Sequence, residues 1–277
     1  MDNAVNDSTA SLRAFTVIGG GRMGEAIVKG LIDSGTVAAG AFTIVEPDAA
    51  RRQALSSAYG VACTNDGMEA VKGAEIVLLA VKPQIIDDVV SSLASGMGQA
   101  LVISIAAGIS CARLESQLGT GSRVVRVMPN TPAMVGSGMS VVSAGSEASS
   151  ADMDMVVRLF SAIGEAIALD ERYQDAATAI SGSGPAYVAL FIDALARAGV
   201  RQGLSRDVAE ALARQTLAGT VDLLEGTGMH PQQLIDGVSS PGGTTIAAIE
   251  ALEAGGFRTS VSAAVSAAVK RSKELGS

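Results

Sequence analysis

The N-terminal half of the chain alternates short apolar runs with stretches whose apolar residues recur at helical spacing. The first run, 14–21, ends in glycines, and Met23, Ile27 and Leu31 then follow on one face of a predicted helix. The run at 100–108 is continuously apolar, as expected of a strand covered on both faces. This alternation predicts a mainly parallel sheet with right-handed crossovers. The other predicted strands are 41–47, 61–64, 74–83, 123–130, 138–145 and 165–170.

The pattern changes near residue 170. After Glu171 the strand signal stops, and the rest of the chain is predicted to be helices separated by Gly and Pro. We therefore predict a disordered polar tail over 1–13, an α/β dinucleotide-binding (Rossmann-type) domain over 14–170 and an all-α domain over 171–277. The predicted helices carry small and apolar residues on several faces, so they must be buried somewhere. Packing against a second copy, in an obligate dimer, would supply that burial.

Composition narrows the class of protein. Of the 277 residues 48% are hydrophobic, and the net charge of −8 comes without any Lys/Arg run, which argues against nucleic acid and anionic membranes as partners. Cys63 and Cys111 stand apart, so neither a disulfide framework nor a zinc site is predicted, and reduced thiols in the cytoplasm are expected. The polar start of the chain has no apolar segment typical of a signal peptide. The apolar run at 186–192 is far too short to span a membrane.

A glycine motif supplies the first candidate site. Gly19, Gly21 and Gly24 form G-x-G-x-x-G directly after a predicted strand and at the start of a predicted helix, which is the context of a dinucleotide-binding turn. Gly19 permits the tight turn, Gly21 lets a pyrophosphate approach bare backbone, and Gly24 allows the helix to pack closely on the strand. The N–H groups and the dipole at the helix start favour the anion. The remaining residues of this turn are Gly20, Arg22 and Met23.

An acidic residue stands at the end of the second predicted strand. Glu46 lies about twenty residues beyond the glycine turn, where a carboxylate accepts hydrogen bonds from the ribose hydroxyls of NAD(H) and repels a 2′-phosphate. Arg51 and Arg52 follow closely. They either neutralise the phosphate of NADP(H) or form a solvated helix face, so the sequence favours NADH only slightly and leaves NADPH open.

Further candidates follow the later strands. Lys82, in "AVKPQ", lies at the carboxyl end of its strand, where open α/β sheets bind ligands, and it either reaches the cofactor or points to solvent. The small residues of "SIAAG" at 104–108 would let a flat ring lie against the backbone. The segment "MPNTP" at 128–132 is too broken by proline to continue a strand, so we expect a shaped loop at the same edge.

A second hydroxyl- and glycine-rich turn, "VSSPGGTT", precedes a predicted helix near the end of the chain. Successive N–H groups at a helix start form an anion site, and glycine lets the backbone come close. The donors would be the backbone of Gly242, Gly243, Thr244 and Thr245, with the Ser240 hydroxyl as a further one. The alternative is a turn whose Ser and Thr side chains only cap the helix.

Six segments in this order resemble the motifs of the pyrroline-5-carboxylate reductase family: "VIGGGRMGEAI", "AVKPQ", "SIAAG", "RVMPNTPA", "SGSGPAY" and "VSSPGGTTIAAIEALE". The resemblance covers about residues 14 to 274, and the last two motifs are the specific ones. It implies NAD(P)H-dependent reduction of the C=N bond of 1-pyrroline-5-carboxylate to L-proline. It also implies an interlocked helical homodimer that often assembles into larger rings.

The resemblance also implies roles for residues. The turn at 19–24 would hold the pyrophosphate, and Asn65 would bind the adenosine part. Glu171 and the loop at 240–245 would form the substrate region, with the Thr245 hydroxyl beside the ring nitrogen. The other cofactor residues would be Ala80, Val81, Lys82, Pro83, Ala106, Ala107 and Gly108. Family members differ at the end of the second strand, so Glu46 leaves the choice of cofactor open, and Gly237 stands where some members carry a polar residue.

The residues favour imine reduction over its rivals. A cyclic imine that binds already protonated accepts hydride without a strong acid, so Thr245 would orient the ring N–H rather than transfer a proton.

Ser183 lies between glycines, but acyl transfer needs a base and the only histidine is His230. A 3-hydroxyacid dehydrogenase would need a lysine on the first helix after the cofactor domain, and the stretch at 185–193 has none. A non-catalytic NAD(P)-binding protein would not need the second glycine turn.

Overall fold

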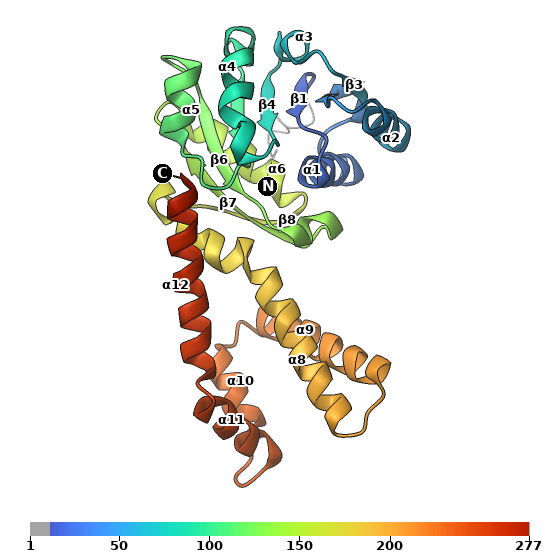
Figure 1. The fold of residues 1–277 in the computed structure, drawn as a ribbon, viewed down its shortest axis with the longest axis vertical. Coiled ribbons are helices and arrows are strands. Elements are labelled where there is room, and N and C mark those ends of the chain that lie inside the picture. The colour runs from blue at the N-terminus through green and yellow to red at the C-terminus, as the bar shows by residue number, and fades with distance from the viewer. Residues whose placement is uncertain (1–11, 277) are drawn as a thin grey trace, which may run out of the picture. The chain divides into compact units, whose positions relative to one another are not determined.

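The computed structural model describes residues 12–276 (Figure 1). The tail predicted over 1–13 lies outside the described residues except for its last two. Leu12 is buried in the core of the sheet, so this residue of the predicted tail is ordered. The described residues divide into two compact units, 12–183 together with 268–276, and 184–267.

The first unit is built on one eight-stranded sheet, in the order β3-β2-β1-β4-β5-β6-β7-β8. All neighbouring strands run parallel except β6 and β7, which confirms the mainly parallel sheet. The strands are β1 (Phe15–Ile18), β2 (Phe42–Val45), β3 (Ala62–Thr64), β4 (Ile76–Leu79), β5 (Leu101–Ser104), β6 (Val124–Met128), β7 (Gly138–Ala144) and β8 (Gly164–Ala168).

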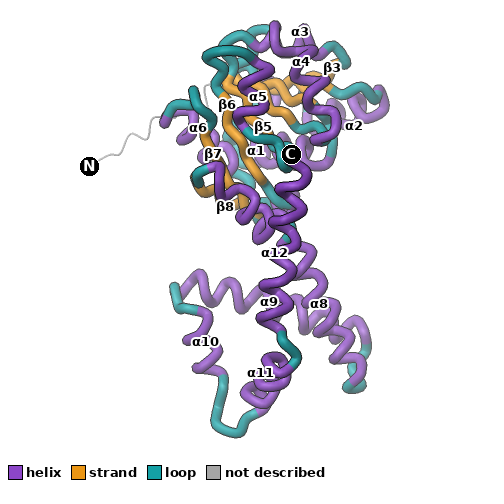
Figure 2. The backbone as a smooth tube through the Cα atoms, turned by 60° about the vertical axis from the view of Figure 1, so that its left-hand side comes forward, coloured by secondary structure: helices purple, strands orange, loops and turns teal. Residues whose placement is uncertain are grey.

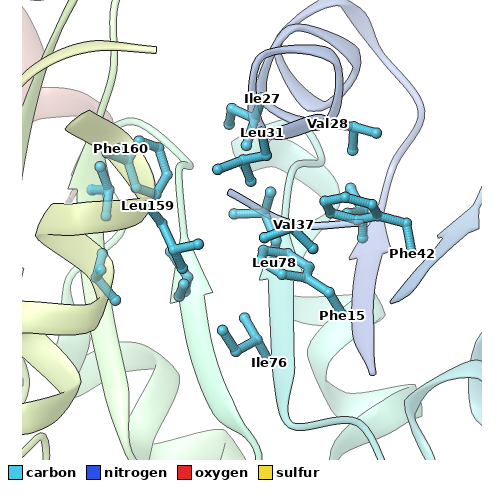
Figure 3. Packing of buried hydrophobic residues seen from close by; sticks show 14 of the residues in the cluster. Phe15, Ile27, Val28, Leu31, Val37, Phe42, Ile76, Leu78, Leu159 and Phe160 are labelled. Carbon is cyan, nitrogen blue, oxygen red and sulfur yellow. The ribbon is translucent and has the colours of Figure 1, made fainter. Parts of the chain in front are cut away.

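Helices cover both faces of this sheet (Figure 2). On one face Phe15 and Leu78 of the strands pack with Ile27 and Leu31 of one helix and Phe160 of another (Figure 3). The other face carries Val90 and Leu114. Helices α1 (Arg22–Asp33), α2 (Ala49–Tyr59) and α6 (Ser150–Ser161) contribute to the first cluster, and α3 (Gly67–Val71), α4 (Ile86–Met97) and α5 (Cys111–Leu118) to the second. The strand residues are buried on alternate faces, which explains the continuous apolar runs in the sequence.

The second unit is entirely helical in the described residues. Ala196, Ala209 and Ala213 are buried where two of its helices meet, because small side chains let the helices approach closely. Its elements are α8 (Gly184–Arg201), α9 (Arg206–Thr227), α10 (Pro231–Val238), α11 (Thr244–Ala254) and the first part of α12 (Phe257–Gly276).

The compact units do not divide at the predicted boundary of 170. Residues 171–183 form a short 3-10 helix (Glu171–Tyr173), α7 (Gln174–Ala177) and a π-helical turn (Thr178–Gly182), and they belong to the sheet unit. Gln174 explains this: its buried amide donates to the carbonyl of Val141 at 3.1 Å and to the hydroxyl of Ser143 at 2.8 Å. Helical periodicity in the sequence does not show that a side chain of this helix forms hydrogen bonds with β7.

One stretch of the described chain, Glu171–Arg201, is long and apolar enough to cross a membrane by length and composition alone. It consists of several helical segments rather than one, and Asp193 and Arg197 form an ion pair at 2.6 Å within α8. Large apolar side chains of α8 are exposed, among them Leu190 and Leu195. The same segment falls within the part of the chain that we expect to meet a second copy.

Candidate active site

The predicted cofactor residues come together at one edge of the sheet. They follow the carboxyl ends of β1 to β5, and because these strands are parallel, their carboxyl ends share that edge. The chain moves outward from β1 through β2 to β3, and then returns to the other side of β1 with β4. This reversal creates the crevice in which open α/β sheets bind dinucleotides. The segments are 19–24, Glu46, Asn65, 80–83 and 106–108.

The glycine turn has the geometry that the sequence predicts. Gly19 has a φ of 107°, and a Cβ there would lie 2.7 Å from the carbonyl oxygen of Ala80. A Cβ on Gly24 would lie 2.5 Å from the carbonyl oxygen of Gly19, so only glycine lets α1 start this close to β1. Gly21, by contrast, has no atom within 4 Å of its Cβ position. The open side of the turn is therefore at the residue that would face a pyrophosphate.

Helix α1 begins without a side-chain cap. Gly21 is its N-cap and offers no side chain. Among residues 12–276 the N–H groups of Arg22, Met23 and Gly24 have no acceptor and remain for a ligand or solvent. Unpaired donors and the positive end of the helix dipole together favour an anion. The start of α1 therefore fits a phosphate group, because the hydrogen-bond donors belong to the backbone and not to a mobile side chain.

Glu46 is tied to the glycine turn. Its Oε2 accepts a hydrogen bond from the N–H of Gly20 at 3.1 Å, and its Oε1 accepts from the N–H of Asp48 at 3.0 Å. The two bonds hold the carboxylate beside the turn. Each oxygen keeps capacity for a further donor such as a ribose hydroxyl, since a carboxylate has about four acceptor positions.

The two arginines after Glu46 already have partners. Arg51 donates to the carbonyl of Gly20 at 2.8 Å and to the carboxylate of Glu25 at 2.6 Å, and Arg51 holds the pKa of Glu25 below its usual value. Arg52 donates to the backbone carbonyls of Glu46 and Pro47 at 2.8 and 2.7 Å. Binding of a 2′-phosphate by either arginine would compete with these contacts.

Two predicted cofactor residues have freely available side chains. Lys82 is exposed at the start of a short 3-10 helix (Pro83–Ile85), and within the described residues its ammonium forms no hydrogen bond or ion pair. Asn65 is exposed directly after β3, while its neighbour Asp66 caps α3 by accepting from the N–H of Glu69 at 3.0 Å. Both side chains are therefore able to contact a ligand without breaking an existing bond.

The second glycine turn lies in the helical unit. The N–H of Gly243 donates to the carbonyl of Ser240 at 3.0 Å, and Gly242 between them has a φ of 68°. A Cβ on Gly243 would overlap with the Ser240 hydroxyl. The turn is therefore closed by one of the N–H groups that the sequence offers as anion donors, and Gly243 is needed for its close backbone approach.

The start of α11 leaves donors unpaired. Gly243 is its N-cap and no side chain caps it, so neither threonine has the capping role that the sequence left open. In the described chain the N–H groups of Thr244, Thr245 and Ile246 have no hydrogen-bond acceptor. The Thr245 side chain is half-buried beside them, whereas Thr244 is exposed. Of the four predicted backbone donors, Gly243 is therefore used within the turn, and Ile246 is an available donor that the sequence did not predict.

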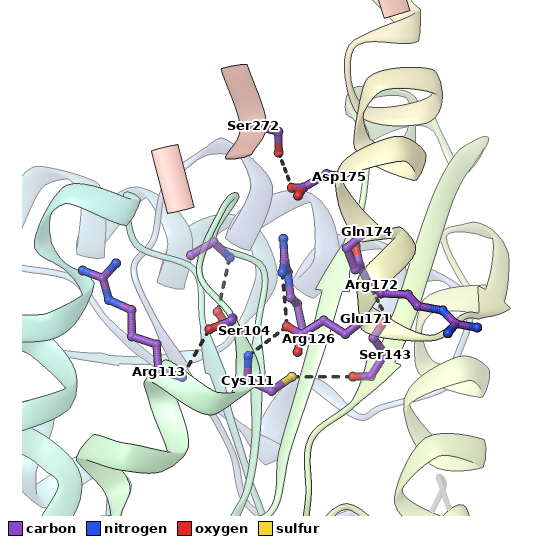
Figure 4. A network of polar contacts seen from close by, with 12 residues as sticks. Ser104, Cys111, Arg113, Arg126, Ser143, Glu171, Arg172, Gln174, Asp175 and Ser272 are labelled. Atoms are coloured by element: carbon purple, nitrogen blue, oxygen red, sulfur yellow. Dashed lines mark hydrogen bonds and ion pairs between the residues drawn. The ribbon is translucent and has the colours of Figure 1, made fainter. Parts of the chain in front are cut away.

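Glu171 lies in the sheet unit and is engaged with the protein (Figure 4). Its Oε1 accepts from the N–H of Cys111 at 2.8 Å and pairs with Arg126 at 3.1 Å. Cys111 is the first residue of α5, which follows the 106–108 segment. Glu171 therefore holds the start of α5, the helix that follows the predicted nicotinamide segment at 106–108. The loop at 240–245, by contrast, lies in the helical unit.

Arg126 is a residue that sequence reasoning missed. It is only 6% exposed on β6, and its Nη2 atom is buried without a hydrogen-bond partner among the described residues. A charged residue inside the apolar strand "RVVRVM" was the available signal, because buried arginines require a partner. The sequence does not show that the partner is Glu171, 45 residues further on.

The two halves of the chain match known family profiles. Residues 14–108 match the family profile described as NADP oxidoreductase, coenzyme F420-dependent, and residues 171–275 match pyrroline-5-carboxylate reductase dimerisation. A pyrroline-5-carboxylate reductase of Synechocystis is 46% identical over 94% of this chain and 97% of its own. The enzyme of soybean (Glycine max) is 45% identical over 93% and 94%.

Solved structures give the same family over nearly the whole chain. A pyrroline-5-carboxylate reductase from Coxiella burnetii superposes with a TM-score of 0.91 at 35% identity, covering 96% of this chain and all of its own. The Plasmodium falciparum pyrroline carboxylate reductase, determined with NADP bound, gives a TM-score of 0.87 at 33% identity and covers 95% and 98%. Prephenate dehydrogenase from A. aeolicus, at 12% identity and a TM-score of 0.56, shares the fold alone. With relatives this similar over nearly its full length, the chain belongs to the pyrroline-5-carboxylate reductase family.

Proposed function

We infer that this chain reduces the C=N bond of 1-pyrroline-5-carboxylate to L-proline with NADH or NADPH, the last step of proline biosynthesis. The observation that carries the inference is the pair of uncapped helix starts, each preceded by a glycine turn. One, at α1, opens onto the dinucleotide edge of the sheet, and the other, at α11, presents free N–H groups beside Thr245. A reductase for an anionic imine has two anions to hold, the pyrophosphate of its cofactor and the carboxylate of its substrate.

At the cofactor edge the backbone does most of the binding. The N–H groups of Arg22, Met23 and Gly24 hold the pyrophosphate, and Gly21 leaves room for it. Lys82 adds a positive charge, and Asn65 contacts the adenosine part. The small residues at 106–108 let the nicotinamide lie against the backbone. When bound, the reduced nicotinamide supplies the hydride.

At α11 the protein fixes the substrate in two places. The N–H groups of Thr244, Thr245 and Ile246 hold its carboxylate, with the Ser240 hydroxyl as a further donor. The Thr245 hydroxyl accepts a hydrogen bond from the N–H of the protonated ring. Because the protonated imine already accepts hydride readily, the protein has to orient the imine carbon and exclude other geometries rather than supply a strong acid. Glu171 is a predicted substrate residue whose Oε1 also supports α5.

Glu46 favours NADH over NADPH. Its carboxylate stands beside the glycine turn with capacity for the ribose hydroxyls, and it repels a 2′-phosphate. Arg51 and Arg52 are committed to Glu25 and to backbone carbonyls, so they do not neutralise a 2′-phosphate without giving up those bonds. The comparison of kcat/KM for the two cofactors tests this preference.

The working form is a homodimer, assembled into a larger ring, in the cytoplasm. The helical unit exposes large apolar side chains that a monomer would leave in water, including Leu190, Leu212, Val221 and Phe257. The dimerisation match covers this whole unit. Burial of these side chains between two copies would supply the core that α8 to α12 lack. Sedimentation at micromolar concentration measures the assembly, and a monomer there would refute it.

One assay tests the function. Absorbance at 340 nm is followed with 1-pyrroline-5-carboxylate and NADH, then NADPH, and the product is identified as proline by mass spectrometry. We expect oxidation of the cofactor that depends on the imine. If the imine leaves the absorbance unchanged, while a 3-hydroxyacid with NAD raises it, the chain is a hydroxyacid dehydrogenase instead. No reaction with either substrate would favour a cofactor-binding protein without catalysis.

A further inference from the structure

Asn130 joins two segments that are far apart in the sequence. Its Oδ1 accepts a hydrogen bond from the N–H of Met139, the second residue of β7, at 2.9 Å. Its Nδ2 donates to the carbonyl of Ser181, in the π-helical turn Thr178–Gly182, at 3.0 Å. The two contacts fix the orientation of the amide, because a backbone N–H needs the oxygen and a carbonyl needs the NH₂ group.

The Ser181 carbonyl needs a donor from outside its helix. In an α-helix the N–H of the residue four positions later would donate to it, and here that residue is Pro185, which has no N–H. The N–H of Ser183 instead donates to Thr178, five residues back, at 2.9 Å, and so forms the π-turn. The amide of Asn130 therefore takes the place of the backbone donor that proline removes.

This turn lies at the edge of the sheet that carries the predicted cofactor residues. Asn130 follows the carboxyl end of β6, which pairs in parallel with β5, the strand before 106–108. Met128, two residues before Asn130, packs on the turn: a Cβ on Gly182 would lie 3.1 Å from the Met128 Cε. The backbone at 181–183 is thus held beside the strand next to the predicted nicotinamide loop.

We propose that Asn130 is a positioning residue for the reductase reaction, which fixes the backbone at 181–183 beside the reactive end of the cofactor. The proposal rests on the proposed function. The amide acts through the Ser181 carbonyl and not on the substrate itself. Loss of its donor lets the turn move, and the imine is then held less well for hydride transfer while the pyrophosphate site, formed by β1 and α1, is unaffected.

The variant that tests the donor alone is Asn130→Asp. An ionised aspartate still accepts from the N–H of Met139, but it sets an oxygen against the Ser181 carbonyl. We expect kcat to fall about tenfold, with KM for NADH within about twofold of the wild type. Gln99→Glu is the matched control: it makes the same change in charge on an exposed side chain just before β5, at the opposite edge of the sheet.

The second variant restores the missing donor. Pro185→Ala returns a backbone N–H that is able to reach the Ser181 carbonyl. In that background we expect Asn130→Asp to cost less than about threefold in kcat, because the carbonyl no longer depends on the side chain. A change that merely destabilised the fold would cost the same in both backgrounds. Thermal unfolding of the wild type, the two single variants and the double variant shows whether each is folded at the assay temperature.

The outcomes are distinct. A tenfold loss in kcat at unchanged KM for NADH, reduced by Pro185→Ala, supports the proposal. If the wild type is active and Asn130→Asp leaves kcat unchanged, this proposal is overturned and the proposed function stays intact. The same holds if Asn130→Asp lowers kcat equally in the wild-type and Pro185→Ala backgrounds. A wild-type protein without reductase activity overturns both.

Discussion

The carboxylate of Glu46 accepts a hydrogen bond from the N–H of Gly20 at 3.1 Å, which ties the acid after β2 to the glycine turn after β1. Two signals that the sequence offers separately, about twenty-six residues apart, therefore act as one unit at the cofactor edge. A substitution of Glu46 has to be interpreted in both roles, as a ribose acceptor and as a support of the turn.

Replacement of Glu46 by Gln should shift the cofactor preference. Glutamine keeps an acceptor for the N–H of Gly20 and removes the charge that repels a 2′-phosphate. We expect the ratio of kcat/KM for NADH to that for NADPH to fall about tenfold, roughly 1.4 kcal/mol of differential binding. Glu69→Gln, on the exposed face of α3, is the control for the loss of one negative charge. An unchanged ratio would remove Glu46 from the choice of cofactor.

Thr245→Ala should lower kcat/KM for the imine by more than about tenfold, which corresponds to about 1.4 kcal/mol of transition-state stabilisation, while the dimer survives. The reason is the loss of the hydroxyl that orients the ring N–H. Thr245→Ser keeps the hydroxyl and should retain most of the activity. Thr259→Ala, on an exposed position of α12, controls for the loss of a surface threonine. Steady-state kinetics that do not distinguish Thr245→Ala from the wild type would place Thr245 outside the site.

Gly243→Ala should weaken substrate binding more than cofactor binding. A methyl group there would overlap with the Ser240 hydroxyl and lie 3.1 Å from the Ser240 carbonyl oxygen, so the turn before α11 has to shift. We expect KM for the imine to rise about tenfold or more, with KM for NADH nearly unchanged. Gly226→Ala, on α9 with open space around its Cβ, should be active and about 0.5–1 kcal/mol more stable. An equal rise in both KM values would argue against a separate substrate turn.

Substitutions of Glu171 distinguish two roles of its carboxylate, the support of Arg126 and α5 and a contact with the substrate. Glu171→Ala leaves the buried guanidinium of Arg126 without its ion pair and the N–H of Cys111 without its acceptor. We expect a loss of about 2 kcal/mol or more in the free energy of unfolding, measured with urea. Glu171→Gln keeps an acceptor for Cys111 and should lose less. A rise in KM for the imine without loss of stability would instead indicate that Glu171 serves only the substrate.

Cys111 should make stability depend on alkaline pH. Burial, reinforced by the neighbouring carboxylate of Glu171, raises the pKa of the Cys111 thiol to about 12. An unfolded chain releases this proton near pH 8.5. The stabilising contribution is therefore complete below about pH 8.5 and is lost as the pH rises towards about 12, by about 1–2 kcal/mol between pH 8.5 and 10.

The comparison with Cys111→Ala isolates this thiol from other groups that titrate in the same range. The difference in unfolding free energy between the wild type and Cys111→Ala should shrink as the pH rises from about 7.5 to about 10. These two pH values lie on either side of about 8.5, where the thiol titrates in an unfolded chain. Cys111 should also resist alkylation by iodoacetamide in the folded protein, because the thiolate is the reactive form. Rapid alkylation of native Cys111 at pH 8 would contradict its burial.

Much of the candidate site was predictable because its signals are local. A G-x-G-x-x-G after an apolar run requires glycine for its own backbone, and the structure shows this directly in the φ of Gly19 and the close contact of Gly24. The strand and helix alternation likewise depends on side chains a few residues apart. Helix α3, by contrast, is only five residues long, which is too short for a periodic pattern in the sequence.

The sequence by itself determined the two glycine turns, the mainly parallel sheet and the helical second half, since each depends on neighbouring residues and backbone geometry. Only the tertiary structure decided which distant groups satisfy one another: Glu171 with Arg126, Asn130 with Ser181, and Gln174 with β7, which moves the boundary of the sheet unit past residue 170. The physical reason is that buried polar groups must find partners, and periodicity shows the need for a partner but not its position in the chain.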